Sequence, residues 1–258
     1  ITLLGSDALV QGDQSWPSFQ GPRGSGATTE RLPQELGGKN ISWERMLPGY
    51  GLSTPVVHSN KVFITCSSGP EQDRLRVLCI DGTKGQSLWE RQFWATGRTM
   101  CHEKTSVAAP TPCTDGVRIY ALFSSNDLVC LDFDGNLIWL RGITADYPNV
   151  SNSLGMASSL VVTDGVVVAQ VENDSESYAI GIDAVTGKNI WKIEREKSAN
   201  WTSPLVLSPG LVGLQSKSGI DAVDTADGHF LWKYDGGAST IPSSCRKGNG
   251  LFVPSKGL

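Results

Sequence analysis

Two features that define common protein classes are missing from this sequence of 258 residues. No stretch approaches the roughly 18 consecutive apolar residues that a membrane-spanning helix needs. The 22 lysine and arginine residues are scattered along the chain and are outnumbered by 26 acidic residues, which gives a net charge of −4. A nucleic-acid groove or a site for an anionic membrane surface needs clustered basic residues. We therefore expect no transmembrane segment and no nucleic-acid partner.

Cysteine and histidine patterns typical of metal or redox sites are also absent. The six cysteines include no CxxC pair and no adjacent pair, which excludes zinc-ribbon and thioredoxin-type sites. Cys66 and Cys79 flank a polar hairpin loop, so a disulfide between neighbouring strands and burial as free thiols are both open for them. Cys113 and Cys130 fall on non-adjacent strands, too far apart for a bridge. The three histidines lie in no metal-spaced cluster, so we expect no metal site.

What the chain does contain is a repeated pattern of an aspartate, a short turn, a glycine and, four residues later, a tryptophan. The four copies are Asp81, Gly85 and Trp89; Asp132, Gly135 and Trp139; Asp183, Gly187 and Trp191; and Asp224, Gly228 and Trp232. Successive tryptophans are 50, 52 and 41 residues apart. A period of roughly 40–50 residues made of short β segments is typical of a β-propeller with one blade per repeat. The fold class predicted is therefore all-β.

Short runs of β-branched and aromatic residues between turn signals predict four strands in each of four full blades. The predicted strands are 53–57, 61–65, 76–80 and 87–89; 111–113, 117–120, 128–131 and 137–139; 158–162, 166–169, 178–182 and 189–191; and 202–206, 211–214, 219–223 and 230–232. No segment longer than a turn predicts a helix.

The two ends of the chain depart from this pattern. Residues 1–14 are expected to be a leader, either a signal remnant or a disordered stretch, and residues 15–258 a partial propeller. Residues 41–46 predict one isolated strand, which carries Trp43 and has the character of a strand that closes a ring. A fifth unit starts at 240–242 and 250–253, but its last strands are missing. The chain therefore predicts an incomplete ring.

The repeated residues have a structural explanation. Aspartate accepts backbone N–H groups across the turn between the third and fourth strands, and glycine takes the positive φ of a bulged hairpin. Tryptophan covers a large apolar area and donates its indole N–H at the seam between blades. Because the four aspartates recur once in each blade, we assign them to turns and not to acid–base catalysis.

Several stretches resemble one known family. Residues 183–191 (DAVTGKNIW) resemble the tryptophan-docking motif of pyrroloquinoline-quinone (PQQ)-type propellers. Residues 16–26 (WPSFQGPRGSG) are similar to the opening of PQQ-like repeat proteins of planctomycete type, as are residues 101–106 (CHEKTS), 109–112 and 114–116. The resemblance covers roughly residues 16–258. It implies blades of PQQ-like type, a bacterial origin and a periplasmic or secreted location. The family includes quinoprotein dehydrogenases, which use PQQ with calcium, and BamB, a non-enzymatic scaffold of outer-membrane protein assembly.

Five residues are candidates for binding a ligand or partner. His102 and Lys104 belong to a polar cluster in a long connection between blades, and such connections border the channel mouth where propellers bind partners. Asn126 and Asp127 lie in a polar run for which a plain hairpin loop is the alternative. Trp201 stands outside the repeated tryptophan position. Two roles are open for it, stacking on a ligand and packing at a seam.

The function that we predict is a non-enzymatic, exported scaffold that binds a protein or saccharide partner through its channel-mouth loops. The alternative is a quinoprotein-type oxidoreductase fragment. The resemblance would then imply two adjacent cysteines over the cofactor, and no such pair occurs in the sequence. We therefore predict no catalytic residues and no cofactor, while PQQ with calcium stays the alternative.

Overall fold

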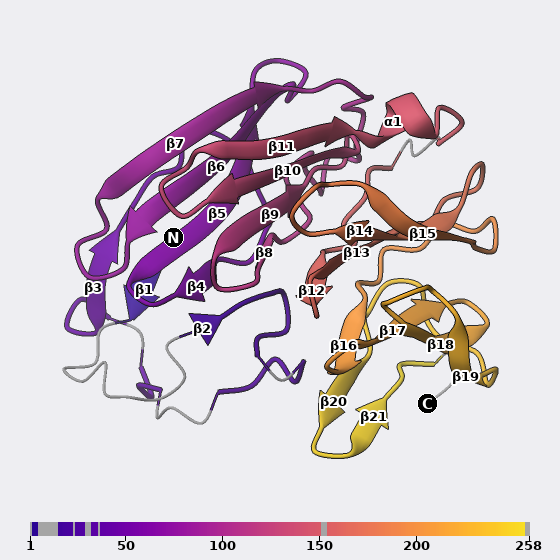
Figure 1. Cartoon of the computed structure of the whole chain (residues 1–258). Coiled ribbons are helices and arrows are strands. Elements are labelled where there is room, and N and C mark those ends of the chain that lie inside the picture. The colour runs from indigo at the N-terminus through magenta and orange to yellow at the C-terminus, as the bar shows by residue number, and fades with distance from the viewer. Residues whose placement is uncertain are drawn as a thin grey trace.

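The computed structural model describes residues 2–4, 15–22, 24–28, 32–35, 37–150 and 154–255. Within these ranges the chain forms antiparallel sheets arranged as a fan, with blade one at one side and the C-terminal strands at the other (Figure 1). The one helix in the described ranges, α1 (Ile143–Asp146), is a single turn. The predicted all-β fold of four-stranded propeller blades is confirmed.

Each of the four blades has its strands in chain order from one sheet edge to the other. Blade one contains β4 (Val56–His58), β5 (Lys61–Ser68), β6 (Arg74–Asp81) and β7 (Ser87–Trp94), with β2 (Ser15–Trp16) added beside β4. Blade two contains β8 (Cys113–Thr114), β9 (Arg118–Leu122), β10 (Asp127–Asp132) and β11 (Leu137–Gly142). Blade three contains β12 (Val161–Thr163), β13 (Val166–Val171), β14 (Tyr178–Asp183) and β15 (Asn189–Glu194). Blade four contains β16 (Leu205–Ser208), β17 (Leu211–Ser216), β18 (Gly219–Asp224) and β19 (Phe230–Tyr234).

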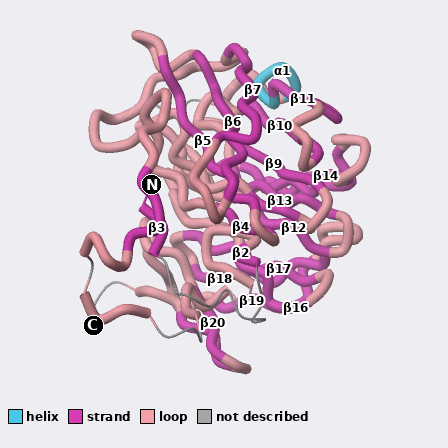
Figure 2. The backbone as a smooth tube through the Cα atoms, turned by 90° about the vertical axis from the view of Figure 1, so that its left-hand side faces the viewer, coloured by secondary structure: helices cyan, strands magenta, loops and turns pink. Residues whose placement is uncertain are grey.

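The blades stack face to face, so their middle strands are buried on both sides. Every residue of β13 is buried, whereas β19, on the outer edge of blade four, is exposed throughout. The first strands of successive blades (β4, β8, β12 and β16) contact one another, which identifies them as the inner edge of the fan (Figure 1). Figure 2 shows the same fan turned by 90°, with α1 as a short helical turn among strands and loops. The hydrophobic core accordingly consists of clusters between neighbouring blades and not of one central core.

Each seam between blades is formed by a tryptophan of one blade on the aspartate turn of the next. The indole N–H donates to the carbonyl of the residue that follows the turn aspartate, at 2.7–3.2 Å. The three pairs are Trp89 with Phe133, Trp139 with Ala184, and Trp191 with Thr225. A second hydrogen bond across the seam comes from an arginine two residues after the tryptophan. Arg91 donates to the Gly135 carbonyl at 2.6 Å, and Arg141 donates to the Gly187 carbonyl at 2.9 Å.

The turn glycine is required for two reasons at once. Gly187 has φ +71°, a conformation that side chains disfavour, and a Cβ added to it would lie 2.7 Å from the ring of Trp139. The aspartate that opens this turn, Asp183, accepts backbone N–H groups of Val185 and Thr186 at 3.1 and 2.7 Å. Asp81, Asp132 and Asp224 accept turn N–H groups in the same way.

The strand around Trp43 is not isolated, contrary to the prediction. β3 (Ile41–Glu44) pairs with β1 (Thr2–Leu4), and Trp43 donates its indole N–H to the Gly82 carbonyl of blade one at 2.8 Å. This is a fifth copy of the seam contact, hidden because no aspartate precedes Gly38 and because the tryptophan follows that glycine by five residues instead of four. The backbone of residues 2–4 therefore lies beside blade one, and residues 5–14 of the predicted leader lie outside the described residues.

The fifth unit starts later than predicted. Residues 240–242 are not a strand; the unit consists of β20 (Cys245–Lys247) and β21 (Gly250–Phe252), which pair with each other.

The disulfide alternative for Cys66 and Cys79 is wrong. Both are free and buried. They lie on the neighbouring strands β5 and β6, but Cys66 is opposite Arg76 and Cys79 is opposite Phe63, so the two thiols are offset along the sheet. Cys113 and Cys130 are also free, with the strand of Tyr120 between them, as the sequence predicted.

Candidate partner-binding face

One face of the fan is built from the long connections between blades, and we call it the loop face. Its connections are residues 95–112, 143–150 with 154–160, 195–204 and 235–244. The hairpins between the second and third strands of each blade lie on the same side. The opposite side carries the short aspartate turns, so the two faces differ in both length and chemistry of their loops.

The connections of the loop face are linked to one another by hydrogen bonds. The backbone N–H of His102 donates to the Leu154 carbonyl at 3.1 Å, and the indole N–H of Trp201 donates to the next carbonyl, that of Gly155, at 2.9 Å. The backbone N–H of Trp201 in turn donates to Thr240 at 2.9 Å. The structure therefore brings two of the sequence-predicted residues, His102 and Trp201, to the same connection from opposite sides.

His102 and Lys104 form an exposed turn. The backbone N–H of Lys104 donates to Nδ1 of His102 at 3.1 Å, so Nδ1 of the imidazole is the acceptor in this turn. The backbone N–H of Thr105 donates to the His102 carbonyl at 2.9 Å and closes the turn. Both the His102 and the Lys104 side chains face solvent.

Asn126 and Asp127 are placed differently, because both are buried. Asn126 has φ +65° and is the left-handed residue of a tight hairpin. The Asp127 carboxylate accepts the backbone N–H and hydroxyl of Thr96 at 3.0 and 2.5 Å and the hydroxyl of Ser125 at 2.7 Å. These contacts fix the start of the 95–112 connection, and they leave the carboxylate inside the protein.

Apolar side chains project from successive connections of this face. Met100 is 54% exposed, Leu154 47% and Ile241 70%, and Trp201 is half-buried between them in chain order. We call these four residues the apolar stripe. Because the hydrogen bonds above join residues 102 to 154, 155 to 201 and 201 to 240, the stripe crosses neighbouring connections.

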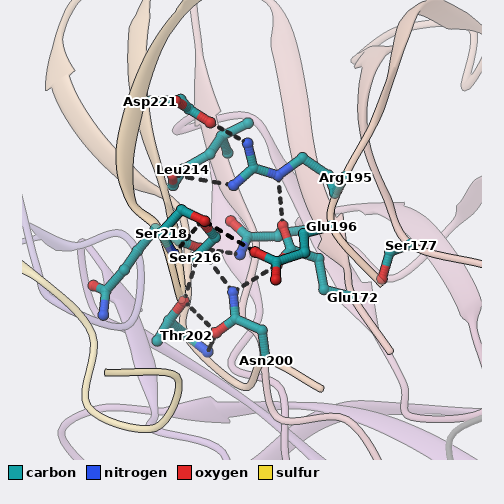
Figure 3. A network of polar contacts seen from close by, with 12 residues as sticks. Glu172, Ser177, Arg195, Glu196, Asn200, Thr202, Leu214, Ser216, Ser218 and Asp221 are labelled. Carbon is teal, nitrogen blue, oxygen red and sulfur yellow. Dashed lines mark hydrogen bonds and ion pairs between the residues drawn. The ribbon is translucent and has the colours of Figure 1, made fainter. Parts of the chain in front are cut away.

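A buried ionic network lies beneath the connection that follows blade three (Figure 3). The Arg195 guanidinium donates through Nε to Glu172 at 2.6 Å and through Nη1 to Asp221, and it reaches the Leu214 carbonyl at 3.3 Å. The side chains of Arg195 and Glu172 are 4% and 2% exposed. Burial raises the pKa of Glu172, although Arg195 acts in the opposite direction. The network joins blade three to blade four.

Amide groups extend this network. Asn200 donates through Nδ2 to Glu172 at 2.8 Å and to the Gln215 carbonyl at 2.7 Å (Figure 3). The Gln215 side chain then donates to the carbonyls of Ser239 and Pro242 at 2.6 and 3.0 Å. The hairpin that contains Glu172 and two connections, 195–204 and 235–244, are thereby fixed by side chains that point into the protein.

A row of hydroxyl groups completes the linkage near the inner edge. In each blade the backbone N–H of one residue donates to the side-chain hydroxyl of the equivalent residue in the next blade, at 2.9–3.0 Å. The series runs from Thr54 to Thr111, Ser159, Ser203 and Ser243. We call this series the hydroxyl belt.

Neither the ionic network nor the hydroxyl belt was predicted from the sequence. The belt has a readable signal, because a hydroxyl residue stands at the start of every predicted first strand. The ionic network has no such signal in the sequence, because Glu172, Arg195 and Asp221 are far apart in the chain and none of them belongs to the repeated pattern.

The described residues do not fit the calcium-bound quinone of the dehydrogenases. Within them, no three or more histidine, cysteine, aspartate or glutamate side chains lie close enough together to hold a metal ion. The adjacent cysteines that the resemblance implied are missing from the whole sequence. The absence of a cofactor stays a prediction. None of the helices in the described part of the chain has the length and apolar character that crossing a membrane requires.

Comparison with known proteins agrees with this architecture. A curated relative, the outer membrane protein assembly factor BamB of Moranella endobia (strain PCIT), is 22% identical over 232 residues, covering 74% of this chain and 56% of the relative. Among solved structures, BamB from Moraxella catarrhalis superposes with a TM-score of 0.58 at 15% identity, covering 83% of this chain and 60% of that chain.

A quinohemoprotein alcohol dehydrogenase from Comamonas testosteroni superposes with a TM-score of 0.63 at 16% identity, covering 90% of this chain and 43% of that chain. At such identities the solved structures show a shared fold only. The chain spans about half the length of the curated relatives that it matches. The family model described as outer membrane protein assembly factor BamB matches residues 37–234, and the chain therefore belongs to this family of PQQ-like propellers.

Proposed function

We propose that the chain is a non-enzymatic scaffold of the bacterial cell envelope that holds a protein partner on its loop face. The name of its curated relatives, outer membrane protein assembly factor, supports a protein partner and a periplasmic location. A saccharide partner has no such support.

The observation that carries this proposal is the apolar stripe on hydrogen-bonded connections. Exposed apolar residues that gather on one surface mark interaction sites, and single scattered ones do not. Here Met100, Leu154 and Ile241 stand on connections that are joined to each other through His102 and Trp201. A partner that binds this face pays little conformational entropy, because the connections are already ordered. His102 and Lys104 add exposed polar groups at one end of the stripe.

The competing function is a quinoprotein-type oxidoreductase, favoured by the likeness in fold to the alcohol dehydrogenase. The buried charged groups near the loop face argue against an oxidoreductase site. Asp127 accepts hydrogen bonds from Thr96, and Arg195 pairs with Glu172 and Asp221. Reconstitution with PQQ and calcium separates the two functions. Stoichiometric quinone binding with dye reduction would overturn the scaffold proposal.

Site-specific photocrosslinking in the native cells tests the scaffold directly. A photoreactive residue placed at His102 or Leu154 samples the loop face. Val117 and Val185 are matched controls, since both are more than half exposed and lie in turns on the opposite side. We expect a discrete crosslinked envelope protein from the loop-face positions only. With the photoreactive residue at position 102, the band should disappear with Leu154→Asp and persist with Val185→Asp. Equal crosslinking from both faces contradicts the proposal.

A further inference from the structure

The glycine- and proline-rich segment at residues 15–22 and 24–28 follows the inner edge of the fan. It begins on blade one, where β2 pairs with β4 and places Ser15 opposite His58 and Trp16 opposite Val57. It next meets blade two, where the backbone N–H of Thr114 donates to the Pro17 carbonyl at 2.9 Å. Both contacts lie at the ends of inner strands. The segment therefore starts by bridging two blades.

The same segment then passes blades three and four. A cavity of about 120 Å³ separates it from their inner strands, and the blade side of this cavity is lined by Val161, Val162, Leu205 and Val206. At Gly24 the gap closes, because a Cβ added there would lie 2.5 Å from Cδ1 of Leu205. Leu205 is itself buried, with 3% of its surface exposed. Gly24 thus packs directly against blade four.

The last contacts are with the fifth unit. The Gln20 side chain donates through Nε2 to the Ser244 carbonyl at 2.8 Å. The backbone N–H of Arg246 donates to the Gly24 carbonyl at 3.0 Å. The Arg246 guanidinium in turn reaches the carbonyls of Val206 and Leu207 on blade four. One short segment therefore touches units that are four seams apart.

We propose that residues 15–22 and 24–28 form an internal strap that makes the blades unfold together. In a protein built from repeats each unit contacts only its neighbours, so stability is a sum of unit and seam terms. Such a chain can open from one end, seam by seam. The strap adds contacts between blade one and the fifth unit that no seam supplies. Opening of the terminal units then requires release of a segment that is paired with blade one.

Two glycines of the strap provide a matched pair of variants. Gly24 and Gly26 both have positive φ, +60° and +62°, so any side chain adds similar backbone strain at either position. Only at Gly24 does the new Cβ meet blade four, since no atom lies within 4 Å of a Cβ at Gly26. A difference between Gly24→Val and Gly26→Val therefore measures the strap contact and not the strain.

Hydrogen exchange as a function of denaturant gives the readout. We expect amides of β5–β6 in blade one and of β17–β18 in blade four to share one unfolding midpoint in the native chain and in Gly26→Val. In Gly24→Val, blade four should exchange at lower denaturant than blade one, by about ten-fold in its opening equilibrium. Separate midpoints in the native chain, or identical behaviour of the two variants, would overturn the strap.

A milder cycle covers the case in which Gly24→Val fails to fold. Gly24→Ala and Leu205→Ala should each raise the unfolding equilibrium constant. The double variant should raise it roughly five-fold less than the product of the two separate increases, because the truncated leucine makes room for the new methyl group. Gly26→Ala with Leu205→Ala should be additive. Additivity in both cycles means that the strap does not pack on blade four, and the proposal is then wrong.

Discussion

His102 and Trp201 donate to adjacent carbonyl oxygens of one connection, His102 to Leu154 at 3.1 Å and Trp201 to Gly155 at 2.9 Å. Two residues 99 positions apart in the chain thus hold a third segment between them. The order of the loop face depends on this pair.

Trp201→Phe removes the indole donor and keeps an aromatic ring. We expect a loss of about 1 kcal/mol in stability and faster hydrogen exchange at Gly155 and Met156, since a partly buried carbonyl loses its partner. Trp94→Phe is the control, because Trp94 is 60% exposed at the end of β7. Exchange rates that change equally in the two variants would contradict the assigned contact.

The seam tryptophans differ in what they contact. Trp191 is 7% exposed and donates to Thr225, whereas Trp232 is 42% exposed and donates to no residue in the described ranges. We expect Trp191→Ala to cost about 3–5 kcal/mol, as for other buried large-to-small changes. Trp232→Ala should cost less than about 1 kcal/mol. Denaturant unfolding of both variants checks this; equal losses would mean that the seam contact contributes little.

The Arg195 network predicts a pH-dependent defect. Arg195→Met leaves Glu172 buried without its cation and should cost about 3–5 kcal/mol near neutral pH. Lys233→Met, which removes an exposed cation 3.6 Å from Asp221, should cost about 0–1 kcal/mol.

Burial raises the pKa of Glu172 in the native chain, and loss of Arg195 raises it further. A carboxyl group with a raised pKa binds its proton more tightly in the folded state, so the folded protein gains stability as the pH falls. The difference between Arg195→Met and the native chain should therefore shrink on acidification. Thermal unfolding across pH measures it, and a constant difference would show that Glu172 is not the group responsible.

The turn aspartates predict the opposite slope. The side chain and then the backbone N–H of Thr186 hold the pKa of Asp183 below its usual value, and turn donors do the same for Asp81 and Asp132. Their stabilisation is complete above the unfolded pKa of about 3.9 and is lost as the pH falls through the lower folded values. Replacing the three with asparagine, which keeps the acceptor oxygen, should flatten the melting temperature below about pH 4. An unchanged acid limb would refute this.

The cysteines predict low reactivity. Burial raises the pKa of Cys66 to about 11 and that of Cys79 to about 12, so almost no thiolate is present near pH 8. A thiol reagent should modify only the half-buried Cys101 and Cys245 in the native chain, and all six cysteines after unfolding. Mass spectrometry under non-reducing conditions checks this, and a Cys66–Cys79 crosslink would contradict the register of β5 and β6.

The blades could be predicted because their signals are local. An aspartate, a glycine and a tryptophan lie within one hairpin, and each has its own conformational reason to be there. Trp43 was not recognised as part of the pattern because the aspartate is missing before it and because its spacing from the turn glycine is one residue longer. The start of the fifth unit was predicted too early because residues 240–242 (TIP) resemble residues 202–204 (TSP) at the start of blade four. The residue equivalent to Ser203 in the hydroxyl belt is Ser243.

The strap and the ionic network could not be predicted, for a different reason. Residues 16–26 have no periodicity, so their sequence indicates a loop without saying which inner strands the loop follows. Glu172 and Asp221 meet Arg195 only after blades three and four are stacked. The same reason explains why the candidate residues of the loop face did not all lie at the surface. His102 is exposed and Asp127 is buried, and the sequence alone does not show which residues become buried.

The seams have one more consequence, for the evolution of such chains. The seam tryptophans Trp89, Trp139 and Trp191 and the backbone donors of the hydroxyl belt all donate to the following blade. A gene that duplicates or loses one whole repeat therefore still encodes matched donors and acceptors at each new junction. Unequal recombination between repeats can change the number of blades without any compensating mutation.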